Sequence, residues 1–68
     1  MTIAEAAAAV LREADGPMHV RKIYAQITSR MLFEFKAKDP ISVLSAVLRK
    51  SAQFEKTGPG TYKLRLTY

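Results

Sequence analysis

The chain has 68 residues, which leaves room for one hydrophobic core and no second module, so most enzyme folds are excluded. Apolar residues make up 49% and charged residues 25%, a composition that predicts a folded domain rather than a disordered tail. With no cysteine and one histidine, disulfides and a thiolate zinc site are excluded, and helix packing must supply the stability.

The net charge is +5, from 11 Lys or Arg and 6 Asp or Glu, and it indicates a polyanionic partner. Residues 1–15 carry −2, from three acids and one base, whereas residues 16–68 carry +7, from ten bases and three acids. We therefore expect one end of the molecule to avoid phosphate and the rest to attract it.

The first element is a predicted helix over residues 3–14. Thr2 and Glu5 have the spacing of a capping box, and Asp15-Gly16-Pro17 supplies the residues that end a helix. The apolar residues recur at steps of three and four: Ile3, Ala7, Val10, Leu11 and Ala14. Small alanine side chains let two other helices approach this one closely.

A short strand is predicted at residues 18–20, followed by a second amphipathic helix at 20–31. The apolar face of this helix consists of Val20, Ile23, Tyr24, Ile27 and Met31. His19 lies where the helix begins, so we expect a cap or a packed turn residue. A ligand role would need metal-binding partners that the sequence lacks.

The third helix is predicted over residues 40–52, because Asp39-Pro40 combines an N-cap residue with proline at the first helical position. Its apolar stripe consists of Ile41, Leu44, Val47 and Leu48. Steps of 100° place the following residues on the opposite face, with Ser45 at its edge: Ser42, Ala46, Arg49, Lys50 and Gln53.

The C-terminal part is predicted to be a β-hairpin, with strands at residues 54–57 and 61–66 and a turn at Gly58-Pro59-Gly60. In the second strand Tyr62, Leu64 and Leu66 alternate with Thr61, Lys63 and Arg65. Lys56 shares a side with Phe54, so either its stem lies along the surface or the strand is irregular there.

This order of elements predicts an α+β fold, a winged helix, as a single domain over residues 1–68. The helices and the hairpin are each too small to bury an apolar face alone, and this arrangement lets them share one core. In helix-turn-helix folds the second helix of the motif lies in the major groove, which here is the helix over residues 40–52.

Four segments, in this order and spacing, resemble the HARE-HTH family over nearly the whole chain: Gly16 to Tyr24, Leu32 to Lys36, Asp39-Pro40 with Leu44-Ser45-Ala46 after it, and Phe54 followed by Gly58 to Leu64. Members of that family are winged helices beside restriction-endonuclease domains, in additional-sex-combs-like chromatin regulators and in the delta subunit of bacterial RNA polymerase. The resemblance implies a DNA-associated module without catalysis, in restriction-modification or transcription regulation, with DNA or modified DNA as its target. The polymerase branch implies that the same fold can serve protein contacts.

The candidate DNA contacts fall into three groups. Ser42, Ser45 and Arg49 are expected to face base edges, although the place of Arg49 in the later half of the helix favours an adjacent phosphate over a base. Lys36, Lys38 and Lys50 are expected beside flanking phosphates, which free amides at the start of the third helix would also approach. In the hairpin, Lys63 and Arg65, with Thr61 at the tip, are expected beside the minor groove or the backbone. For each residue the alternative is a solvated side chain on an exposed face.

Three classes of function compete. The acidic residues stand at spacings that serve caps and solvent, so we expect no enzyme, no metal or other cofactor and no small-molecule substrate. A DNA-binding module would bind duplex DNA, alone or within a larger enzyme or a chromatin or transcription protein. As a protein-interaction module, the chain would use Ala4, Ala8 and Ala9, which lie off the apolar stripe, although alanine also simply favours helix formation.

The location that follows is intracellular: the cytoplasm or nucleoid of a bacterium, or a eukaryotic nucleus. No apolar stretch is long enough to span a bilayer, so we expect no membrane partner. The lack of cysteine is typical of a reducing compartment.

Overall fold

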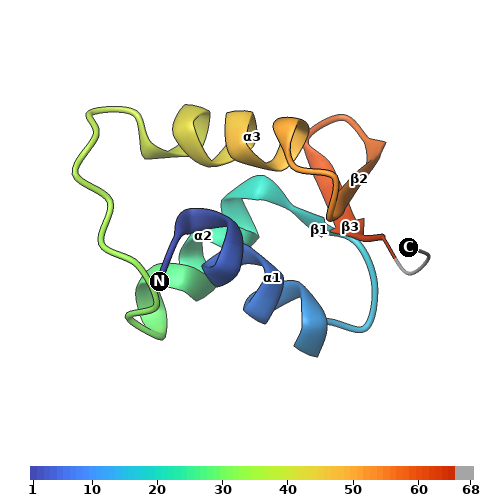
Figure 1. The fold of residues 1–68 in the computed structure, drawn as a ribbon, viewed down its shortest axis with the longest axis horizontal. Coiled ribbons are helices and arrows are strands. Elements are labelled where there is room, and N and C mark those ends of the chain that lie inside the picture. Colours follow the sequence, from blue (N-terminus) through green and yellow to red (C-terminus); the bar gives the residue numbers. More distant parts are fainter. Residues whose placement is uncertain (66–68) are drawn as a thin grey trace.

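Three helices and a three-stranded antiparallel sheet follow one another in the order of a winged helix, which confirms the predicted α+β class (Figure 1). The computed structural model describes residues 1–65. The elements are α1 (Ile3–Glu13), β1 (Met18–His19), α2 (Val20–Ser29), α3 (Pro40–Lys50), β2 (Phe54–Gly58) and β3 (Thr61–Leu64).

The helices begin at the predicted residues because each has a side-chain cap. Before α1, the Thr2 hydroxyl accepts a hydrogen bond from the Glu5 N–H at 3.1 Å, and the Glu5 carboxylate accepts one from the Thr2 N–H at 2.7 Å. The bond from the Thr2 backbone is the largest cause of the lowered pKa of Glu5. Before α2, His19 Nδ1 accepts from the Arg21 N–H at 3.2 Å, so His19 is the cap that the sequence predicts.

Helix α1 packs against α2, α3 and β3, and its alanines allow these close approaches (Figure 1). Ala6 and Ala7 are fully buried, and Ala8 is 3% exposed. The expectation that Ala8 lies off the apolar stripe is therefore wrong. Because α1 contacts both α2 and α3, more of its circumference is buried than the one apolar stripe. Ala4 and Ala9, at the margins of this buried surface, are half-buried.

Each helix ends earlier than predicted, and α2 shows why. Met31 adopts a left-handed conformation, with φ of 56°, and the Leu32 N–H donates to the Ile27 carbonyl at 2.9 Å. This is a Schellman ending, which usually has glycine at the left-handed position. The prediction of Met31 on the buried face is wrong: Met31 lies outside the helix, 87% exposed, and Leu32 packs against the core instead.

Strand β3 is the central strand of the sheet and pairs with both β1 and β2. Met18 pairs with Tyr62, and Phe54 pairs with Leu64. The register between β2 and β3 shifts between Lys56 and Gly58, which confirms an irregular strand at Lys56. Leu66, predicted at the end of the second hairpin strand, lies outside the described residues.

The core joins all three helices to the hairpin. Its buried residues are Ala6, Ala7, Ala8, Val10, Leu11, Val20, Ile23, Ile27, Leu44, Leu48, Phe54 and Tyr62. Leu44 and Leu48 of α3 belong to the same cluster as Phe54 and Tyr62, so the hairpin and α3 hold each other in place. None of the helices in residues 1–65 is long and apolar enough to cross a membrane.

Replacing Gly60 with alanine should lower the free energy of unfolding by about 1 to 3 kcal/mol. Gly60 has a φ of +65°, and a Cβ atom there would lie 2.9 Å from His19 Nε2. The Gly60 carbonyl also accepts from the Val20 N–H at 2.8 Å, so the turn cannot shift without disturbing the start of α2. Urea denaturation measures the loss.

The matched control is Gly58→Ala, because a Cβ atom at Gly58 would have nothing within 4 Å. That substitution should change the free energy of unfolding by less than about 1 kcal/mol. Equal losses in the two variants would contradict the prediction that the left-handed φ of Gly60 and its close approach to His19 require glycine there.

Candidate nucleic-acid interface

The start of α3 is fixed by Asp39, whose carboxylate accepts from the Ser42 hydroxyl at 2.7 Å and from the Ser42 N–H at 3.2 Å. These two bonds, the hydroxyl first, lower the pKa of Asp39, and the nearby Arg21 charge adds to the effect. The cap therefore stabilises the fold at neutral pH, and this contribution is lost as the pH falls through the lowered pKa. The expectation of a free amide at Ser42 is wrong, because the chain's own carboxylate occupies it.

The segment between α2 and α3, residues 30–39, is longer than the tight turn of a simple helix-turn-helix motif. Leu32, Phe33 and Phe35 pack against the core and hold the segment in place. Lys36 and Lys38 are exposed and lie just before the first turn of α3. Two of the three predicted phosphate-binding lysines are thus at the N-terminal end of that helix, and the third, Lys50, is in its last turn.

One face of α3 is free of the other elements (Figure 1). Its exposed residues are Ser42, Val43, Arg49 and Lys50, and Ala46 between them is half-buried. Three of the predicted contacts, Ser42, Arg49 and Lys50, therefore share this face. Val43, 37% exposed, is an apolar residue there that the sequence analysis missed.

Ser45 lies on the hairpin side of α3 rather than at the centre of the free face. It is half-buried, and its hydroxyl oxygen is 3.5 Å from the Tyr62 hydroxyl oxygen. Tyr62 is 1% exposed, so this contact joins α3 to the middle of the sheet. The sequence could not show this contact because it depends on how the hairpin folds back onto α3.

The two faces of the hairpin differ in charge. Lys63 pairs with Glu55 across the strands, with a distance of 3.9 Å between the Lys63 nitrogen and the Glu55 carboxylate oxygen. Lys63 also lines a hollow together with Arg12 and Asp15, so the charge around it is mixed. On the opposite face, Lys56 pairs with Tyr62 and is exposed, beside the surface that packs on α3.

The other two predicted hairpin contacts flank Lys63. The Thr61 hydroxyl donates to the Pro59 carbonyl at 3.2 Å, which stabilises the turn. Arg65 is exposed, and its N–H donates to the Gln53 carbonyl at 2.7 Å. The side chain of Arg65 therefore projects from an anchored backbone.

Two basic residues near this surface were not predicted as DNA contacts from the sequence. Lys56 broke the alternation of the first hairpin strand, and this was interpreted as a stem lying along the surface or an irregular strand, not as a DNA contact. Arg21, exposed near the start of α2, lies close enough to Asp39 to affect its pKa. Its position could not be predicted, because the path of the segment from α2 to α3 sets it.

Comparison with protein families gives a match over nearly the whole chain. A family model described as a helix-turn-helix domain of proteins that include ASXL and restriction endonucleases matches residues 1–66. The chain belongs to the HARE-HTH family. HARE-HTH domains are a DNA-binding type of helix-turn-helix domain and not a catalytic family. Searches of curated proteins and of solved structures gave no match.

In this HARE-HTH domain, basic side chains lie along α3 and on the segments at its two ends. Lys36 and Lys38 precede the helix, Arg49 and Lys50 occupy its last turn, and Lys56 follows on the hairpin. The 11 residues of α3 extend about 16 Å, the length of about five base pairs. Within residues 1–65, no three His, Cys, Asp or Glu side chains gather as a metal site would require.

Proposed function

We propose that this HARE-HTH chain, as one domain over residues 1–68, is a non-catalytic module that binds double-stranded DNA. In this proposal α3 lies in the major groove and the β2–β3 hairpin lies on the DNA backbone. The observation that carries it is the free face of α3, where Arg49 and Lys50 are exposed and the neighbouring side chains are short. Such a module would act inside the cell on genomic DNA. It would be part of a restriction enzyme, a chromatin regulator or a transcription protein.

The roles of the individual residues follow from their positions. Short Ser42 and half-buried Ala46 let the helix backbone approach the groove closely. Lys36, Lys38 and Lys50 would contact phosphates at either end of α3, because flexible lysines on exposed positions neutralise phosphates without reading bases. The Asp39 carboxylate already accepts from the Ser42 N–H and hydroxyl, so at this end of α3 the lysines and not the Ser42 amide would contact the phosphates.

The alternative function is a protein-interaction module, and exposed Val43 on the free face of α3 favours it. Salt separates the two functions. DNA affinity should fall steeply with added salt, because phosphate contacts release counterions, whereas an apolar contact should change little. Titration of the protein with methylated and unmethylated duplexes, each at two salt concentrations, tests DNA binding and the reading of modified bases together.

The hairpin contacts can be tested with variants on its two faces. Lys56→Ala should weaken binding to all duplexes alike and lower the salt slope by about one, because a phosphate contact carries no base information. The double variant Lys63→Ala with Arg65→Ala should also weaken all duplexes alike. Its effect per charge removed should be smaller, since Glu55 already neutralises part of the Lys63 charge. Fluorescence anisotropy with labelled duplexes measures both. Unchanged affinity of both variants at low salt would remove the hairpin from the interface.

A further inference from the structure

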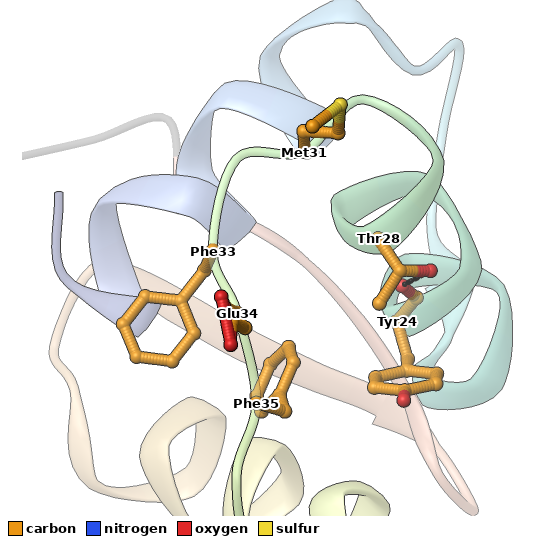
Figure 2. Close-up of a pocket in the computed structure, with 6 residues that line it drawn as sticks. All are labelled: Tyr24, Thr28, Met31, Phe33, Glu34 and Phe35. Carbon is orange, nitrogen blue, oxygen red and sulfur yellow. Dashed lines mark hydrogen bonds between the residues drawn. The ribbon is translucent and has the colours of Figure 1, made fainter.

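An aromatic hollow of about 320 Å³ opens between the end of α2 and the segment that leads to α3. Its lining residues are Tyr24, Thr28, Met31, Phe33, Glu34 and Phe35 (Figure 2). Residues 31–35, which supply four of the six lining residues, lie at the end of the molecule opposite the β2–β3 hairpin (Figure 1). The DNA contacts proposed above use none of these six residues.

Three aromatic rings form the wall of this hollow. The Phe35 ring centre is 5.1 Å from the Tyr24 ring centre, with an angle of 56° between the planes. Phe35 is also 5.1 Å from Phe33, with an angle of 65°. Rings tilted in this way pack edge against face and hold one another in place, and all three line the hollow. The Thr28 hydroxyl already donates to the α2 backbone, so it adds no unsatisfied donor.

The charge within the hollow comes from one carboxylate, although residues 16–68 are basic as a whole. Of the described residues that line it, only Glu34 is charged, and Figure 2 shows Glu34 between Phe33 and Phe35. Within residues 1–65, the salt bridges are Arg30–Glu13 and Lys63–Glu55, so Glu34 forms none. A carboxylate beside aromatic faces attracts a cation and repels phosphate.

Met31 at the edge of the hollow supports a binding role. It is 87% exposed and holds a φ of 56°, a conformation that glycine adopts without strain and methionine does not. Among residues 1–65, the most exposed large apolar side chain thus stands at a position where glycine would be more stable. Backbone strain of this kind is common at ligand-binding sites, where a side chain serves binding at a cost to the stability of the fold.

We propose that this hollow binds the ammonium group of a lysine side chain on a partner protein, and binds it best when the nitrogen is methylated. Aromatic rings attract the cation through their faces, Glu34 provides the opposite charge, and Met31 covers the alkyl chain. Methylation favours binding because an unmodified ammonium group is strongly hydrated and must lose water to enter. This inference does not depend on DNA binding.

The test is an NMR titration of the ¹⁵N-labelled chain with three small compounds: Nα-acetyl-trimethyllysine amide, the unmodified lysine amide, and the neutral compound with carbon in place of the trimethyl nitrogen. We expect affinity to fall in the order trimethyllysine, lysine, neutral compound, with about a fivefold difference between the first and the last. Shifts should be confined to amides at residues 24–35. Equal affinity of the neutral compound, or no shifts, would overturn the proposal.

Two variants separate the contributions. Glu34→Gln, on an exposed residue, should weaken trimethyllysine binding about two- to fivefold and leave the melting temperature unchanged, whereas Glu55→Gln is the matched control and should have no effect on binding. Met31→Gly should raise the melting temperature by a few degrees and still weaken binding. Unchanged binding in Glu34→Gln would contradict a cation site.

Two further results would assign the hollow to another occupant. Tighter binding of 5-methyl-2′-deoxycytidine than of trimethyllysine would make it a nucleobase site. Shifts of the same amides on raising the protein concentration alone would make the occupant a second copy of this chain. Either result would overturn the proposal of a partner's lysine.

Discussion

Replacing Leu48 with alanine should lower the free energy of unfolding by about 2 to 5 kcal/mol. Leu48 is 1% exposed and belongs to the cluster that joins α3 to Phe54 and Tyr62 of the hairpin. A domain of this length has a total stability of only about 3 to 10 kcal/mol, so the variant should lose a large share of it and unfold at a clearly lower urea concentration. Urea denaturation followed by circular dichroism measures the change.

The matched control is Val43→Ala on the same helix. Val43 is 37% exposed on the free face of α3, so truncating it should change the free energy of unfolding by less than about 1 kcal/mol. A Leu48→Ala variant as stable as the Val43→Ala variant would mean that α3 does not bury its Leu44 and Leu48 face.

The starts of all three helices were predictable, and so was the end of α1 to within one residue, whereas the ends of α2 and α3 were not. Thr2, His19 and Asp39 each cap a helix with a side chain that the sequence displays directly. The end of α2 depends on Met31, a residue whose type gives no signal for a left-handed conformation. The end of α3 likewise has no glycine to indicate it in the sequence. The helix stops at Lys50, because the backbone of Ser51 is extended.

The residues of the candidate interface were predictable where they depend on one helix, and not where they depend on contacts between elements. Helical spacing placed Ser42, Arg49 and Lys50 on one face, as the structure has them. The Ser45 contact with Tyr62 and the Lys63 contact with Glu55 arise from the folding of the hairpin. No periodicity within a single segment reports such contacts.

Replacing Arg49 with alanine should weaken binding to all DNA duplexes alike and lower the salt slope by about one. Arg49 lies in the last turn of α3, where helix-turn-helix proteins more often contact the backbone than the bases. With Lys50 beside it in that turn, Arg49 forms part of a basic end of the helix. Anisotropy titrations against a panel of duplexes at two salt concentrations measure both quantities.

The same titrations distinguish a phosphate contact from the reading of a guanine. If Arg49 reads a guanine, its removal should weaken the binding free energy by about 1 to 3 kcal/mol for duplexes with that base. The preference for guanine at that position should also weaken. Ser42→Ala is the control at the opposite end of the free face, and because the Ser42 hydroxyl donates to Asp39 its loss should change sequence preference little. Loss at a single sequence in Arg49→Ala would replace the phosphate role with base reading. No loss with any duplex would remove this face of α3 from DNA binding.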